Sequence, residues 1–186
     1  MNRYPEFIEV DLKKYKINTD FRVALRCDEV SRDDSIGEYE KCLALIYMLL
    51  GEEALNDYDN HTKFLKLLIK YLRCNKELND DIQDKEPSMN YKQDIGYIKA
   101  SFMSDYKIDL DKIEMHWWQF YDLLQGLTEN SVLNRVRTIR EEPLNNKKGK
   151  ERQKWIDAKK QVELKREKTI EEKKLDKYWE EQLRKR

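Results

Sequence analysis

The chain has 186 residues, 40% of them charged and 39% hydrophobic, and its 37 Lys and Arg residues balance 37 Asp and Glu residues. This length suits one domain with an appendage, and five Gly and three Pro residues exclude a collagen-like or linker-like protein. The longest apolar run, Cys42–Leu50, is about half the ~20 residues that a membrane-spanning helix needs. Because the first residues also lack the order of a secretory signal, we expect a soluble, cytoplasmic protein.

Residues that perform chemistry are scarce in this sequence. Its three cysteines, Cys27, Cys42 and Cys74, form no C-x-x-C pair, and each lies among apolar neighbours. We therefore expect free, buried thiols in a reducing compartment. The two histidines, His61 and His116, do not have the spacing of a zinc site, and the sequence contains no glycine-rich phosphate loop or nucleophile motif. The sequence thus predicts no enzyme, no metal and no cofactor.

A short β-hairpin is predicted at the start of the chain, over about residues 4–17. The runs Phe7–Val10 and Tyr15–Ile17 are rich in β-branched and aromatic residues, with residues 11–14 as the turn. An isolated hairpin is barely stable in water, so we expect this one to lie against the helices that follow.

Helical spacing dominates the rest of the chain and predicts a mainly α fold, a helical bundle. Apolar residues recur every three or four positions over about 21–30, 36–50, 62–72, 91–102, 110–127 and 131–139. Ser35 and Glu38 fit a capping box for the second of these helices. Since Cys42–Leu50 is apolar almost all round, this helix is expected to be central and the most buried. Residues 76–90 are acidic and polar, which predicts a surface loop.

Charge is distributed unevenly along the chain. Residues 143–186 hold 16 Lys and Arg and 9 Asp and Glu, a net charge of +7, which leaves 1–142 with −7. We therefore divide the chain into a helical domain, 1–142, and a basic, highly charged C-terminal helical arm, 143–186. Many Glu–Lys pairs at i,i+4 spacing predict one long helix over 147–186. Its apolar residues are sparse, so we expect it to be flexible until it docks.

The basic arm is compatible with more than one kind of partner. Lys and Arg clusters bind nucleic acid by releasing phosphate counterions, but acidic residues interrupt them here and no nucleic-acid-binding motif accompanies them. Docking on a protein is therefore favoured over nucleic acid. The opposite charges of the two parts also permit head-to-tail self-association of copies. Nothing in the sequence predicts a membrane partner.

Six residues are candidates for contact with a partner protein. Adjacent helical residues point about 100° apart, so the aromatic side chains between Trp117 and Tyr121 cannot all share one stripe. Either all of them belong to the core, or some lie in an interface, where aromatic residues and arginine are enriched. The candidates are Trp118, Tyr121, Arg137, Arg140, Trp155 and Trp179.

Four blocks of the sequence occur in a recognisable order: Ile17–Leu25 after the hairpin, Asp33–Ile36 leading into Tyr39–Leu50, His116–Leu127, and Arg137–Leu144. Together they resemble the bacteriophage gene-product-fifteen family, which is found in tailed phages and prophages. The resemblance covers most of residues 4–165. Its most specific parts are Asn18-Thr-Asp-Phe-Arg22 and His116-Trp-Trp118, whereas residues 76–90 and the last twenty residues carry no family signature.

This resemblance implies a role in assembly rather than a reaction. The family has no established catalytic residues, and its genes usually lie between those for the tail-tube and tape-measure proteins. That position implies a non-enzymatic tail assembly chaperone, which binds the tape-measure protein and the tail-tube protein in the bacterial host cytoplasm. Two alternatives remain open: a structural tail or connector component retained in the virion, and a nucleic-acid-binding protein that uses the basic arm.

Overall fold

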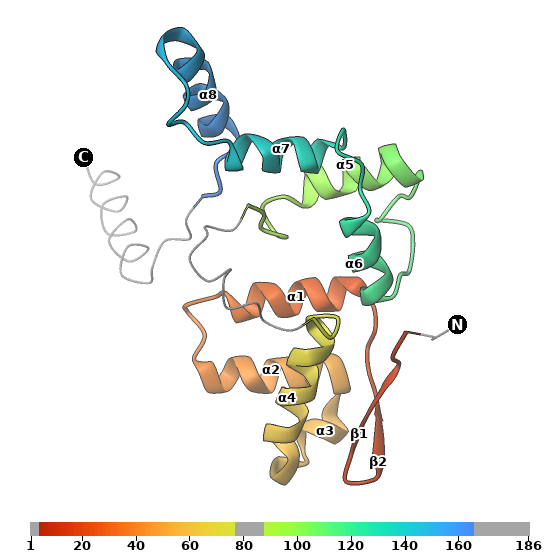
Figure 1. The fold of residues 1–186 in the computed structure, drawn as a ribbon. Coiled ribbons are helices and arrows are strands. Elements are labelled where there is room, and N and C mark those ends of the chain that lie inside the picture. Colours follow the sequence, from red (N-terminus) through yellow and green to blue (C-terminus); the bar gives the residue numbers. More distant parts are fainter. Residues whose placement is uncertain (1–3, 77–87, 166–186) are drawn as a thin grey trace, which may run out of the picture.

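A computed structural model describes residues 4–76 and 88–165, and the fold is mainly α with an N-terminal β-hairpin, as the sequence predicts (Figure 1). The first part of the chain forms β1 (Phe7–Val10), β2 (Lys13–Lys16), α1 (Phe21–Ser31), α2 (Glu38–Leu50), α3 (Glu52–Leu55), the 3-10 helix η1 (Tyr58–Asn60) and α4 (His61–Leu72). The second part forms α5 (Ile95–Tyr106), α6 (Trp117–Gln125), α7 (Val132–Glu141) and α8 (Gly149–Val162).

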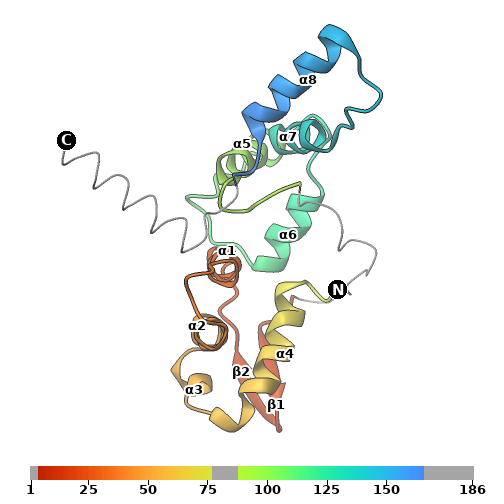
Figure 2. The same ribbon diagram turned by 90° about the vertical axis from the view of Figure 1, so that its left-hand side faces the viewer.

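The two parts of the chain lie at opposite ends of the molecule, with α6 between them (Figures 1 and 2). The hairpin and α1–α4 form one end, and α5, α7 and α8 form the other. One continuous cluster of buried apolar side chains joins them, from Tyr15 and Phe64 to Leu133. Phe120 of α6 is fully buried and stacks on Phe21 of α1 with ring centroids 4.8 Å apart, and it also stacks on a phenylalanine of α5. Helix α6 therefore connects the two ends through aromatic packing.

The hairpin has a tighter turn than the sequence predicts. β1 and β2 pair from Phe7 with Lys16 to Val10 with Lys13, so only Asp11 and Leu12 form the turn. Both turn residues have positive φ, 49° and 66°, as a two-residue hairpin with the twist of its strands requires. The expected packing of the hairpin on helices is observed, because Tyr15 meets the Phe64 ring of α4 edge-on.

The helix predicted over 110–127 begins later, at Trp117. Lys107 ends α5 in the left-handed conformation, and residues 107–116 are not helical, with a turn at 110–112. Arg22 of α1 holds this segment, since its guanidinium donates to the carbonyls of Leu110 and Ile113 at 2.9 and 2.7 Å. The apolar residues of this segment have helical spacing, but hydrogen bonds to another part of the chain determine its backbone conformation.

The expectation that α2 is central and most buried is wrong. Helix α2 lies on the outside of the molecule beside α1 and α4, and only Leu45, Ile46 and Leu49 of the helix are buried (Figure 2). The predicted capping box is also wrong: Gly37 is the N-cap, and the Ser35 hydroxyl donates to Asp33 instead.

The single long helix predicted over 147–186 is wrong in the described part. Helix α8 ends at Val162, because Glu163 takes an extended conformation, and α8 packs against α7. Residues from 166 onward, which include Trp179, lie outside the described residues, as do residues 77–87 of the predicted loop. The division of the chain at residue 142 stays a prediction.

All three cysteines are free, but the expected burial holds only for Cys27, because Cys42 and Cys74 are half-buried. Across residues 4–76 and 88–165, no helix is both long and apolar enough to cross a bilayer.

Candidate partner-binding surface

The start of α6 joins segments that are far apart in the sequence. His116 is the N-cap of α6, and its Nδ1 accepts from the Trp118 amide at 3.0 Å. Its Nε2 lies 3.0 Å from the Pro5 carbonyl. Since Nδ1 accepts, Nε2 carries the proton and donates to Pro5, which fixes the neutral tautomer. An isolated β-bridge pairs His116 with Asp20, the N-cap of α1. The two most specific blocks of the resemblance therefore meet in space.

The two tryptophans at the start of α6 stabilise the end of α4. The indole N–H of Trp117 donates to the Leu72 carbonyl, and that of Trp118 donates to the Tyr71 carbonyl, both at 3.0 Å. Carbonyls in the last turn of a helix have no partner within that helix. The Leu72 carbonyl gains its partner from Trp117, whereas the Tyr71 carbonyl accepts from both Trp118 and the Cys74 amide, the latter at 2.9 Å. Trp118 is half-buried and stacks on Tyr71. Its polar group faces inward, which gives it a role in the fold.

Tyr121 of α6 is half-buried and contacts the end of the first part of the chain. The ammonium of Lys76 lies 4.5 Å from its ring centroid and 3.3 Å from its hydroxyl oxygen. A cation over an aromatic ring is attracted by the ring quadrupole. One face of the Tyr121 ring is thus already occupied by its own chain.

Arg140 of α7 joins three elements at the other end of the molecule. Its guanidinium donates to both carboxylate oxygens of Asp94, at 2.7 and 2.8 Å. It also donates to the carbonyls of Ser88 and Val162. Asp94 is 1% exposed and the Arg140 side chain 11% exposed. This bidentate ion pair therefore fixes α7, the start of α5 and the end of α8.

Of the remaining candidates, Arg137 lies beside this ion pair, Trp155 lies on α8, and Trp179 lies outside the described residues. Arg137 is half-buried and donates to Ser88 Oγ and Asn134 Oδ1. Trp155 of α8 is half-buried beneath the Lys147 ammonium, 5.3 Å from its ring centroid. The structure thus brings Arg137 and Arg140 together, but it separates Trp118 and Tyr121 from them and from Trp155. Their contact with a partner stays a prediction.

An exposed apolar face lies on α2, and we call it the α2 face. It consists of Tyr39, Leu43 and Tyr47, which recur every four residues along one side of the helix. Tyr39 is 64% exposed, Tyr47 is 51% exposed and Leu43 is half-buried. None of the three belongs to the core cluster or to the side chains that pack on it. This face covers about two helical turns.

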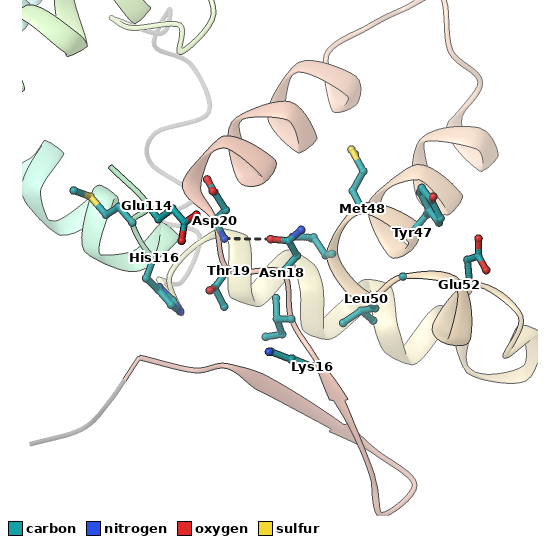
Figure 3. A pocket seen from close by; sticks show the side chains of 14 residues that line it. Lys16, Asn18, Thr19, Asp20, Tyr47, Met48, Leu50, Glu52, Glu114 and His116 are labelled. Carbon is teal, nitrogen blue, oxygen red and sulfur yellow. Dashed lines mark hydrogen bonds between the residues drawn. The ribbon is translucent and has the colours of Figure 1, made fainter. Parts of the chain in front are cut away.

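An open groove of about 930 Å³ adjoins the α2 face (Figure 3). Tyr47 and Glu52 lie on one side of the groove, and Glu114 and His116 lie on the other. The extended segment Asn18–Asp20, which belongs to the first specific block, lies between them. The groove is thus lined by both specific blocks and by the end of α2.

Charged side chains are spread around this groove. Its charged groups, which include Lys16, Glu52 and Glu114, come from separate elements around an open, solvated depression. Within residues 4–76 and 88–165, no group of three or more His, Cys, Asp and Glu side chains is placed to hold a metal ion.

At the N-terminal end of α2, Glu38 lies 2.7 Å from the Lys41 ammonium and raises the pKa of Lys41.

Sequence reasoning missed Tyr39, Leu43 and Tyr47, although a signal was present. The helix that carries them is apolar almost all round, which is typical of a helix that is covered on every side. The sequence cannot say whether the same chain or another chain supplies that cover.

Comparison with protein families identifies the chain. The family described as Bacteriophage Gp15 protein matches residues 2–164. The chain belongs to the Bacteriophage Gp15 family. The expected resemblance is confirmed, and the match includes the α2 face and both specific blocks. Membership supports a structural or tail-related phage protein. Comparisons with curated proteins and with solved structures gave no significant match.

Proposed function

We propose that this Gp15 protein is a non-enzymatic chaperone of phage tail assembly, acting in the host cytoplasm on the tape-measure and tail-tube proteins. The observation that carries the proposal is the exposed α2 face, which residues 4–76 and 88–165 leave without apolar cover. A tape-measure protein is a long helical rod with apolar stripes. Such a rod needs reversible cover before the tube encloses it, and a helix laid along the α2 face supplies that contact.

The size of the α2 face favours a weak and reversible contact. Full burial of a leucine-sized side chain stabilises a complex by roughly 1.5–3 kcal/mol. Leu43 is already half-buried, and Tyr39 and Tyr47 are partly covered. The three side chains together therefore contribute at most about 5 kcal/mol before the cost of association. One copy binds weakly, whereas several copies on one long partner gain avidity. Weak single contacts suit a chaperone that must leave before the virion is complete.

Co-expression with the tape-measure protein tests this function. The variants are the double substitution Tyr39→Ser/Tyr47→Ser and the control Tyr58→Ser, which changes a tyrosine that is 71% exposed outside the α2 face. Wild type and the control are expected to raise the soluble fraction of the tape-measure protein, and the double variant is not. Equal solubility with and without the Gp15 protein would contradict the proposal.

Two further measurements separate the alternatives. Mass spectrometry of purified virions is expected to find no stoichiometric Gp15 protein, whereas a stoichiometric amount would favour a retained tail component. For nucleic acid, residues 147–165 hold eight Lys and Arg and three Asp and Glu. Binding to a DNA duplex that falls steeply with salt and disappears on removal of residues 143–186 would favour that alternative.

A further inference from the structure

Acidic side chains surround the α2 face. Residues 28–59, which run from the end of α1 through α2 and α3 to η1, contain ten Asp and Glu and two Lys and Arg, a net charge of −8. Exposed carboxylates lie at both ends of α2, from Asp34, Glu38 and Glu40 at its start to Glu52 and Glu53 just past its end. The apolar stripe is therefore bounded by negative charge at each end.

Only part of this charge is balanced by the described chain. Glu38 pairs with Lys41, and Glu53 pairs with Lys13 of β2 at 2.8 Å. Glu40 and Glu52 form no ion pair with any residue of 4–76 or 88–165. These two carboxylates lie near opposite ends of the stripe, Glu40 in the first turn of α2 and Glu52 at the start of α3, directly after the Gly51 that ends α2. They are placed to pair with a ligand that spans the α2 face.

We propose that the α2 face binds an amphipathic helix that carries Lys or Arg on both sides of a two-turn apolar stripe. The stripe of the partner packs on Tyr39, Leu43 and Tyr47, and its basic ends meet Glu40 and Glu52. The apolar contact supplies the affinity, and the charges fix the position of the helix and speed its encounter with the acidic face. This inference rests on the proposed function and names the chemistry of the segment that the chaperone recognises.

A second copy of this chain does not fit the α2 face as well. The basic helix of the described chain is α8, which lies at the opposite end of the molecule (Figure 1). Its apolar residues Trp155 and Ile156 are half-buried in a helix that packs on α7. Helix α8 therefore presents mainly charged side chains, which cannot cover an apolar stripe. Nucleic acid is disfavoured because the face is acidic.

Binding of three synthetic helical peptides to the purified full chain tests the proposal, with fluorescence anisotropy as the readout. The first peptide has a Leu stripe with Lys at both ends, the second has the same stripe with Glu at both ends, and the third keeps the Lys residues but has Ser in place of Leu. The first is expected to bind at least about tenfold more tightly than either of the others, because only it satisfies both the stripe and the charges.

Variants of the protein locate the site and separate its two parts. The double variant Tyr39→Ser/Tyr47→Ser is expected to weaken binding of the first peptide more than about tenfold, and Tyr58→Ser is expected to leave it unchanged. Glu40→Gln/Glu52→Gln is expected to weaken binding roughly 3- to 10-fold at low salt and to reduce its salt dependence.

Three results would overturn the inference. They are equal binding of the Lys-ended and Glu-ended peptides, equal binding of the Leu and Ser peptides, and concentration-dependent dimerisation of the free chain that Tyr39→Ser/Tyr47→Ser abolishes. If Glu40→Gln/Glu52→Gln still solubilises the tape-measure protein with full efficiency at low salt, the partner does not need basic ends to bind. The inference about its charges is then wrong, while the proposed function stands. If every α2 variant still solubilises the tape-measure protein, the α2 face is not the surface through which the chaperone acts.

Discussion

Removing the Asp94 carboxylate tests whether Arg140 serves the fold. In the variant Asp94→Ala, the buried guanidinium loses both of its carboxylate bonds, of 2.7 and 2.8 Å, and keeps those to the carbonyls of Ser88 and Val162. Breaking a buried ion pair costs about 3–5 kcal/mol, because the remaining charge is buried without its counterion. The retained bonds place the expected loss in the free energy of unfolding near the lower end, about 3 kcal/mol.

The chain offers a matched control for this variant. Lys99 of α5 pairs with Asp111 at 2.6 Å, but the two side chains are 42% and 66% exposed. Asp111→Ala is expected to cost less than about 1 kcal/mol, because water and salt screen an exposed pair. Urea unfolding followed by far-UV circular dichroism measures both variants. Equal losses for Asp94→Ala and Asp111→Ala would refute the reasoning that burial, and not distance, decides the strength of the pair.

Three further predictions concern other parts of the fold. Trp118→Phe removes the indole donor of the Tyr71 carbonyl, which keeps only the Cys74 amide, and is expected to lower the free energy of unfolding by about 1 kcal/mol in urea titrations. No loss would show that the amide alone satisfies this carbonyl. Leu12 has a positive φ of 66° in the exposed hairpin turn, which glycine adopts without strain. Leu12→Gly is therefore expected to stabilise the chain by about 0.5 kcal/mol, measured as a higher melting temperature. A lower melting temperature would contradict the turn geometry. Burial raises the pKa of the thiols of Cys27 and Cys74 to about 12, so both groups hold their protons more tightly in the folded state. Stability is expected to be complete below about pH 9 and to fall above it, by up to about 1.4 kcal/mol per pH unit for the fully buried Cys27 and by less for the half-buried Cys74. Cys27→Ala is expected to flatten that decline in a pH series of melting curves.

The sequence predicts most of the helices because their apolar residues repeat with the helical period. Helix α1 begins after the N-cap Asp20 and α7 after the N-cap Ser131, where side-chain oxygens accept from the backbone of the first turn. The start of α6 is different, because tertiary bonds decide it. The carbonyls of residues 110 and 113 bind Arg22 of α1, more than eighty residues earlier in the chain, and no local pattern contains that information.

The partner surface is predicted less well for a related reason. Tryptophan and arginine are enriched in interfaces, and this statistic selects Trp118 and Arg140. In the structure both side chains direct their polar groups to backbone carbonyls or to a buried carboxylate of their own chain. The exposed face belongs to Tyr39 and Tyr47, in a helix whose apolar character predicts burial. Sequence patterns identify which residues need cover, whereas the fold decides which of them remain without it.

Photo-crosslinking in phage-producing cells tests most directly whether the α2 face binds the tape-measure protein. A benzophenone amino acid replaces Tyr39 or Tyr47 in the full chain, and the same substitution at Tyr58 serves as the control. The account predicts a crosslink to the tape-measure protein from both α2 positions and none from the control position. Crosslinks from Tyr58 alone, or α2 crosslinks only to a second copy of the chain, would contradict it.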